Sequence, residues 1–80
     1  MATRFVTLPA DGSWQLVTDQ AEWLVQNISS NEVKVHIGAS APAAGAAYHS
    51  LGTGEGISTV GTGSVYAKSS WENAFVTVTD

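Results

Sequence analysis

The sequence contains no cysteine, so no disulfide can stabilise its fold. The only histidines are His36 and His49, and no thiolate is available to join them, so we expect no metal site. A domain of 80 residues buries only about 60% of the surface that its unfolded chain exposes, and domains of this size usually rely on disulfides, a metal or partner subunits. Oligomerisation is therefore the expected source of additional stability.

Positive charge is also scarce. Arg4, Lys34 and Lys68 are the basic residues, against seven carboxylates, and the formal net charge is −4. Surfaces that bind nucleic acids or anionic membranes need clustered Lys and Arg, so we expect neither partner. Charged residues make up 12% of the chain, about half the share usual in soluble domains. This composition suits a surface that neighbouring subunits cover.

Long apolar runs are absent as well. No stretch approaches the roughly 18 apolar residues of a membrane span, and the first residues lack the apolar core of a signal peptide. We therefore expect the protein to be made and kept in a cytoplasm until it assembles into something larger.

Period-2 alternation of apolar and polar residues recurs along the chain, and helical periodicity is nearly absent. In Glu32–Gly38, for example, three aliphatic residues share one face, and Lys34 and His36 share the other. Short strands with a turn signal about every 8–12 residues predict one all-β domain over residues 1–80, a small antiparallel β-sandwich or barrel of seven to eight strands. The predicted strands are Arg4–Leu8, Ser13–Thr18, Ala21–Ile28, Glu32–Gly38, Tyr48–Leu51, Gly56–Val60, Ser64–Lys68 and Ala74–Thr79.

The connections between these strands carry further predictions. Ala39–Ala47 is predicted to be an irregular loop, because Pro42 and Gly45 leave no uninterrupted helical turn. A helix over Gln20–Ile28, capped by Asp19, is the weaker alternative to the third strand, because that segment contains several poor helix formers. The short connection between the third and fourth strands predicts that they pair as an antiparallel hairpin.

No motif for catalysis stands out. The glycines between 52 and 63 lack the lysine of a phosphate-binding loop and are better explained as hairpin turns. His36 falls on the outer face of a strand and His49 beside a loop, and neither accompanies a nucleophile elbow. We expect a protein that is not an enzyme, with no catalytic, cofactor-binding or metal site.

Aromatic residues carry a clearer functional signal. Alternation places Phe5, Tyr66 and Phe75 on outward faces and Trp71 in a turn. Aromatic residues are enriched at protein–protein interfaces, so these four are candidate interface residues. The alternative is that the faces are reversed, or that both faces of each sheet are covered within the monomer.

Two other aromatic residues are expected in the core, and the surface ones also allow a different function. Trp14 and Trp23, as large alternating residues within strands, are expected in the core. Stacked surface aromatics also suit sugar binding, and Trp71-Glu72-Asn73 sets an aromatic ring beside polar groups. A carbohydrate-recognition module is therefore an alternative to an assembly role.

Six features, found in order across roughly residues 13 to 79, carry a family resemblance. They are Trp14-Gln15-Leu16-Val17, Val25-Gln26-Asn27, Val33-Lys34-Val35-His36-Ile37-Gly38, Pro42 in an alanine-rich loop, Leu51 before a glycine turn, and Val65-Tyr66-Ala67-Lys68. In this order they resemble a group of short bacteriophage virion proteins known as decoration, cement or head-fibre proteins.

The resemblance implies a viral structural subunit that oligomerises, often as a homotrimer, and decorates or cements the capsid in the virion. Its expected partners are copies of itself and the major capsid protein. Terminal arms and loops make the contacts in such families, which implies contact segments at Met1–Thr7 and Ala39–Ala47. The candidate capsid contacts are Thr3, Arg4, Pro42 and Tyr48. The alternative is a tail- or fibre-associated module that binds a carbohydrate or host surface, in which case changes at Trp71 or Tyr48 abolish binding.

Overall fold

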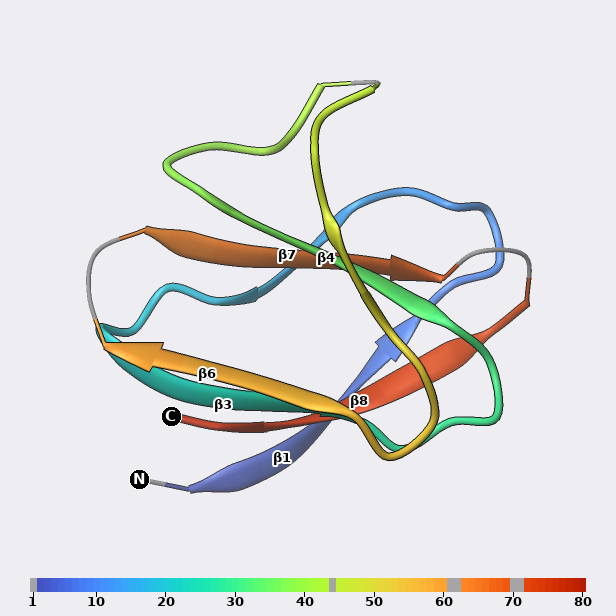
Figure 1. The fold of residues 1–80 in the computed structure, drawn as a ribbon, viewed down its shortest axis with the longest axis horizontal. Helices are drawn as coiled ribbons and strands as arrows, with labels where there is room; N and C mark the ends of the chain where they lie inside the picture. The colour runs from blue at the N-terminus through green and yellow to red at the C-terminus, as the bar shows by residue number, and fades with distance from the viewer. Residues whose placement is uncertain (1, 44, 61–62, 70–71) are drawn as a thin grey trace.

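The computed structural model describes residues 2–43, 45–60, 63–69 and 72–80 (Figure 1). These residues form eight strands and no helix, so the third strand replaces the helix considered for residues 20–28. The strands are β1 (Thr3–Leu8), β2 (Gln15–Thr18), β3 (Glu22–Asn27), β4 (Val33–Gly38), β5 (His49–Leu51), β6 (Gly56–Val60), β7 (Ser64–Ser69) and β8 (Ala74–Thr79). None of the described residues belongs to a helix that could cross a membrane.

The strands form two antiparallel sheets of four strands each. Sheet A has the order β1-β8-β3-β6, and sheet B has the order β2-β7-β4-β5. The chain therefore pairs its first strand with its last, its second with its seventh, its third with its sixth and its fourth with its fifth. This is the jelly-roll arrangement, an eight-stranded sandwich built from two Greek keys. The predicted all-β class is confirmed, and the sandwich is the form that it takes.

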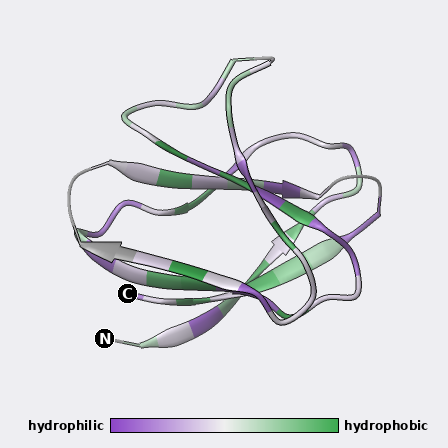
Figure 2. Ribbon diagram, viewed as in Figure 1, coloured by the Kyte–Doolittle hydropathy of each residue, from purple (hydrophilic) through white to green (hydrophobic). Residues whose placement is uncertain are grey.

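Alternation along the strands builds the core between the sheets. In β3, β7 and β8 every second residue is buried, and Figure 2 shows hydrophobic residues interleaved with polar ones along the strands. Among the residues that the structure describes, valine supplies seven of the twelve in the core, since a β-branched side chain fits a pleated surface well. The core residues are Leu8, Val17, Trp23, Val25, Val33, Val35, Leu51, Val65, Ala67, Ala74, Val76 and Val78.

The predicted hairpin between the third and fourth strands is wrong, because β3 lies in sheet A and β4 lies in sheet B. The side chain of Asn27 is fully buried at the end of β3, where the chain leaves sheet A for sheet B. Its Nδ2 donates to the carbonyl oxygens of Asn31 (2.7 Å) and Leu51 (2.9 Å). Its Oδ1 accepts from the backbone N–H and the hydroxyl of Ser29. A connection of a few residues is long enough to cross the roughly 10 Å between packed sheets.

The prediction for Trp14 is also wrong, whereas Trp23 is buried as expected. Trp14 is half-buried and precedes β2. In β2 the pairing register shifts between Leu16 and Thr18, as in a β-bulge, so that Val17 and Thr18 are both buried. Leu16 is 54% exposed, and Trp14, two residues before it, shares its outward side of sheet B.

The two expected contact segments differ in structure. Thr3–Thr7 belong to β1 and pair with β8, and the backbones of Ala2 and Asp80 also bond to each other, so these residues are an edge strand and not a free arm. The described part of 39–47 forms neither strand nor helix, in agreement with the predicted loop. In Figure 1 this loop stands away from the sheets at the top of the view, and the two termini lie at the lower left.

Candidate functional site

The outer face of sheet A carries exposed apolar residues and very little charge. Phe5 is 74% exposed, Leu24 44% and Phe75 42%. Phe5 pairs with Thr77 and Phe75 with Thr7, so the two rings are diagonal neighbours on adjacent strands. We call this surface the apolar face; its described outward residues are Thr3, Phe5, Thr7, Glu22, Leu24, Gln26, Ser58, Phe75, Thr77 and Thr79, of which only Glu22 is charged.

The outer face of sheet B has a different chemistry. Lys34 pairs with Lys68, so two like charges stand directly opposite each other on adjacent strands. Each ammonium is drawn onto an aromatic ring: the Lys34 Nζ lies 4.9 Å from the ring centroid of Tyr48, and the Lys68 Nζ lies 4.8 Å from that of Trp14. These contacts hold the two cations apart and also order the rings.

Two more rings complete this surface. His36 pairs with Tyr66, and its imidazole meets Trp14 edge to face, with 6.0 Å between ring centroids. We call this surface the aromatic–cationic face; it consists of Trp14, Lys34, His36, Tyr48, Tyr66 and Lys68. The four strands of sheet B contain no carboxylate, although the whole protein is acidic.

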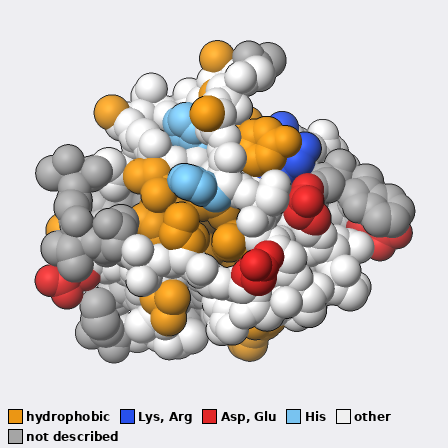
Figure 3. All heavy atoms as spheres, viewed as in Figure 1, with side chains coloured by type: hydrophobic (Ala, Val, Ile, Leu, Met, Phe, Trp, Pro, Cys, Tyr) orange, Lys and Arg blue, Asp and Glu red, His pale blue; other side chains and the backbone are white. Residues whose placement is uncertain are grey.

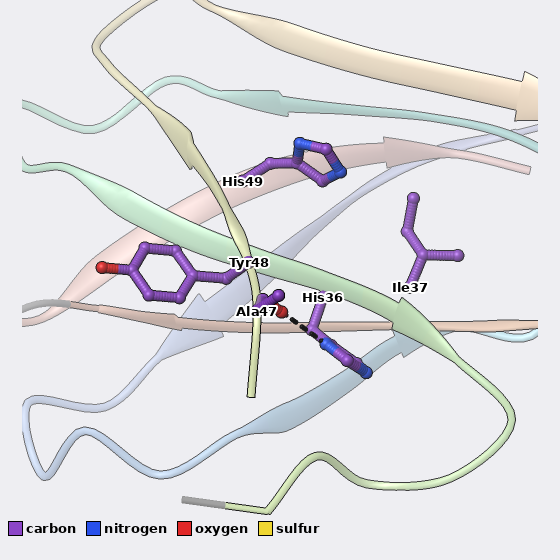
Figure 4. A pocket seen from close by; sticks show the side chains of 5 residues that line it. All are labelled: His36, Ile37, Ala47, Tyr48 and His49. Atoms are coloured by element: carbon purple, nitrogen blue, oxygen red, sulfur yellow. Dashed lines mark hydrogen bonds between the residues drawn. The ribbon is translucent and has the colours of Figure 1, made fainter. Parts of the chain in front are cut away.

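A pocket of about 230 Å³ borders this face where β4 approaches β5 (Figure 4). It is lined by His36, Ile37, Ala47, Tyr48 and His49. Figure 4 shows Tyr48 and His49 extending to different sides of the β5 segment, and Figure 3 shows both imidazoles at the surface near a group of hydrophobic side chains. The His36 Nδ1 lies 2.7 Å from the Ala47 carbonyl oxygen and donates to it, so Nε2 is the acceptor of the neutral ring.

A polar network ties the two sheets together beside the termini. Arg4 forms an ion pair with the Asp80 carboxylate and donates from Nη2 to the Val17 carbonyl oxygen at 2.7 Å. Thr18 donates from its hydroxyl to Asp80 Oδ2 at 2.6 Å. The Thr18 hydrogen bond, aided by Arg4, lowers the pKa of the Asp80 carboxyl.

The candidate interface residues do not share one surface. Phe5 and Phe75 lie together on the apolar face, whereas Tyr66 lies on the opposite side of the sandwich. Trp71 lies outside the described residues. The sequence did not indicate that Leu24 would lie on the same sheet face as the two phenylalanines, because alternation gives the face of a residue but not the sheet to which its strand belongs.

The four candidate capsid contacts are also spread over the molecule. Thr3 lies on the apolar face, where its hydroxyl is 2.8 Å from that of Thr79, and Arg4 is engaged by Asp80. Pro42 lies in the irregular loop, and Tyr48 lies next to β5 beneath Lys34. Within the described ranges, His, Cys, Asp and Glu side chains form no group of three or more that could hold a metal ion. The expected absence of metal, cofactor and catalytic sites stays a prediction.

No protein-family model matches the chain, and no curated protein matches its sequence. In fold it is similar to protein NMB1881 from Neisseria meningitidis, a crystal structure that aligns with a TM-score of 0.61 over 95% of this chain and 68% of that chain. The aligned sequences are 13% identical, so the similarity concerns the sandwich alone.

Proposed function

We propose that the protein is a non-catalytic structural subunit that assembles through its apolar face and decorates or cements a bacteriophage capsid. The observation that supports assembly is the exposure of Phe5, Leu24 and Phe75 on one nearly uncharged sheet face. Exposed apolar residues that share one polar-rimmed face are typical of interaction sites. The capsid as the setting rests on the sequence resemblance.

The size of the apolar face limits how strongly it binds alone. Strands of six residues are about 20 Å long, and four adjacent strands are about 19 Å wide, so the face covers roughly 400 Å². A standard interface buries about 800 Å² on each partner. We therefore expect weak self-association in dilute solution and firm attachment on a shell, where several contacts act together.

The edge of sheet A offers a way to enlarge the contact. β1 is one of the two edge strands of sheet A, and it carries Phe5, the most exposed of the large apolar residues that the structure describes. A contact between the apolar face of one copy and the β1 edge of the next is heterologous, and contacts of this type form a ring when the rotation between copies closes. A trimer is the smallest such ring, and we propose it as the assembled form.

Light scattering during size-exclusion chromatography, across a hundredfold dilution, tests the assembly. We expect wild type to shift from oligomer to monomer as it is diluted, and Phe5→Ala to weaken association by about 2 kcal/mol, or roughly thirtyfold. Tyr66→Ala removes an aromatic ring from the opposite face and is the matched control. A wild type that stays monomeric at every concentration, or equal weakening by both variants, would contradict the proposal.

The capsid as partner is tested separately, by cosedimentation with shells assembled from the major capsid protein of a phage that encodes this chain. We expect wild type to pellet with the shells and Phe5→Asp to remain in the supernatant. A gene that lies among tail-fibre genes would instead favour the alternative, a module that recognises a host surface.

A further inference from the structure

The aromatic–cationic face carries positive charge, whereas the molecule as a whole carries net negative charge. The chain carries a formal charge of −4, yet the strands of sheet B hold two of its three basic residues, both histidines and no carboxylate. An anion is therefore attracted to this face while the acidic remainder of the surface repels it.

The two lysines are positioned to receive an anion. Lys34 and Lys68 stand opposite each other and rest on separate rings, Tyr48 and Trp14. A ring occupies one side of each ammonium, and an ammonium has three N–H groups with which to donate to an acceptor. Lys34 does not line the pocket itself, but its ammonium contacts the ring of Tyr48, which is one of the lining residues.

The pocket has the size and lining for one ring of a ligand. Its volume of about 230 Å³ is below the roughly 300 Å³ at which sites for drug-sized molecules begin. Ile37 and Ala47 supply apolar contact, and Tyr48 supplies an aromatic ring. A pyranose ring presents C–H groups that pack on such surfaces and a rim of hydroxyls.

The His36 ring is held in one orientation by a hydrogen bond within the protein. Its hydrogen bond to the Ala47 carbonyl places a proton on Nδ1, so Nε2 of the neutral ring is the atom that accepts a hydroxyl hydrogen. A Cβ at Gly38 would lie 2.8 Å from this Nε2, so glycine at position 38 allows the imidazole to hold its place.

From these features we infer that the pocket binds one carboxylated sugar unit of an acidic polysaccharide, with the carboxylate paired to Lys34. The ring packs against Tyr48 and the aliphatic lining, and a hydroxyl donates to His36. A nucleic acid fits less well, because a phosphate backbone needs a longer row of cations than this face offers. The inference goes beyond the proposed assembly, which uses the other side of the sandwich.

Titration of the isotope-labelled protein with tetragalacturonate, followed by two-dimensional NMR, tests the site. We expect chemical-shift changes concentrated in residues 34–37 and 47–50. The fully methyl-esterified tetrasaccharide, with the same rings and no charge, should bind at least tenfold more weakly, because a charge-assisted hydrogen bond is lost.

Variants separate the parts of the site. Lys34→Met keeps the aliphatic stem and removes the charge, and we expect about tenfold weaker binding that Lys34→Arg restores. Tyr48→Ala should weaken both the acidic and the esterified ligand. Phe5→Ala lies on the apolar face and should leave binding unchanged even where it disrupts assembly, so failure of one proposal is distinguishable from failure of the other.

Three results would overturn the inference. They are an absence of shifts with tetragalacturonate at millimolar concentration, equal binding of the acid and its ester, and an equal response to a single-stranded oligonucleotide of the same charge.

Discussion

Asn27 bonds to two segments of the sandwich, the connection that follows β3 and the end of β5 with the connection after it. Its side chain bonds to Ser29, Asn31 and Leu51, and its backbone N–H donates to the Glu55 carbonyl oxygen at 2.9 Å. We expect Asn27→Ala to lower the free energy of unfolding by about 2–4 kcal/mol, because several buried donors and acceptors lose their partner at once. Urea denaturation measures the change. Gln26→Ala, at the exposed neighbouring position, should change stability by less than about 1 kcal/mol, and equal effects would contradict the role of Asn27.

Asp80 gives the protein a dependence on pH. Its carboxyl has a lowered pKa in the folded state, chiefly through the Thr18 hydrogen bond and then through Arg4. The stabilisation is therefore fully present above the unfolded pKa of about 3.9 and is lost as the pH falls through the lower, folded pKa. Thermal unfolding between neutral pH and about pH 2.5 should show a smaller acid-induced loss of Tm for Asp80→Asn than for wild type. Glu22→Gln removes one exposed carboxylate as a control, and a profile for Asp80→Asn identical to that of wild type would exclude this role.

At the scale of elements, the pairing of β1 with β8 decides whether the first residues are an arm or part of the sandwich. Thr3 and Thr79 are directly opposed, with their hydroxyls 2.8 Å apart. We expect the double variant T3C/T79C to form a disulfide on mild oxidation and to gain at most about 4 kcal/mol of stability, because the loop that it closes spans nearly the whole chain. Mass spectrometry and thermal melting with and without reductant measure both effects.

The pair T7C/T79C is the control for that experiment. Thr7 is opposed to Phe75, so Thr7 and Thr79 are separated by about 13 Å along the strand, well beyond disulfide reach. Equal oxidation of the two pairs would mean that the segment moves freely and does not hold its place in sheet A.

At the scale of the whole molecule, the two outer faces should respond differently to salt. Contacts of the apolar face are made by uncharged side chains, whereas binding at the aromatic–cationic face depends on Lys34. Raising the ionic strength from about 0.05 to 0.5 M should leave the oligomer intact and weaken tetragalacturonate binding several-fold. Light scattering and calorimetry in the same buffers measure the two effects. Parallel weakening of both would show that the faces do not act separately.

How far the sequence predicts this molecule depends on which property is considered. Alternation predicted all eight strands with ends within two residues, and it predicted that Phe5, Tyr66 and Phe75 point outward. It could not predict which strands are neighbours, because the pattern within a strand does not depend on the sheet that contains it. The wrong hairpin and the separation of Tyr66 from Phe5 both follow from that limit.

The alternation pattern also could not predict features that depend on a bulge in one strand or on side-chain contacts between strands. The bulge in β2 buries two consecutive residues, Val17 and Thr18, so the pattern alone does not show which side Trp14 takes, and no residue in β2 marks a bulge as a glycine would. The aromatic–cationic face assembles side chains from four separate segments. Its only signal in the sequence was the alternation of Lys34 and His36 on one face of a predicted strand.

The pairing of β1 with β8 also constrains how the chain folds. Residue 3 pairs with residue 79, and β3 lies between β8 and β6. No three neighbouring strands of sheet A therefore come from one continuous stretch of chain. Contacts between such distant residues require large loops to close before any pairing energy is gained, and domains of this kind fold in milliseconds to seconds. During synthesis, β1 and β3 have emerged from the ribosome with an unpaired edge while β8 is still missing. Until residues 74–79 appear, the hydrophobic sides of these strands are open to other chains, so slow synthesis or high expression favours aggregation over folding.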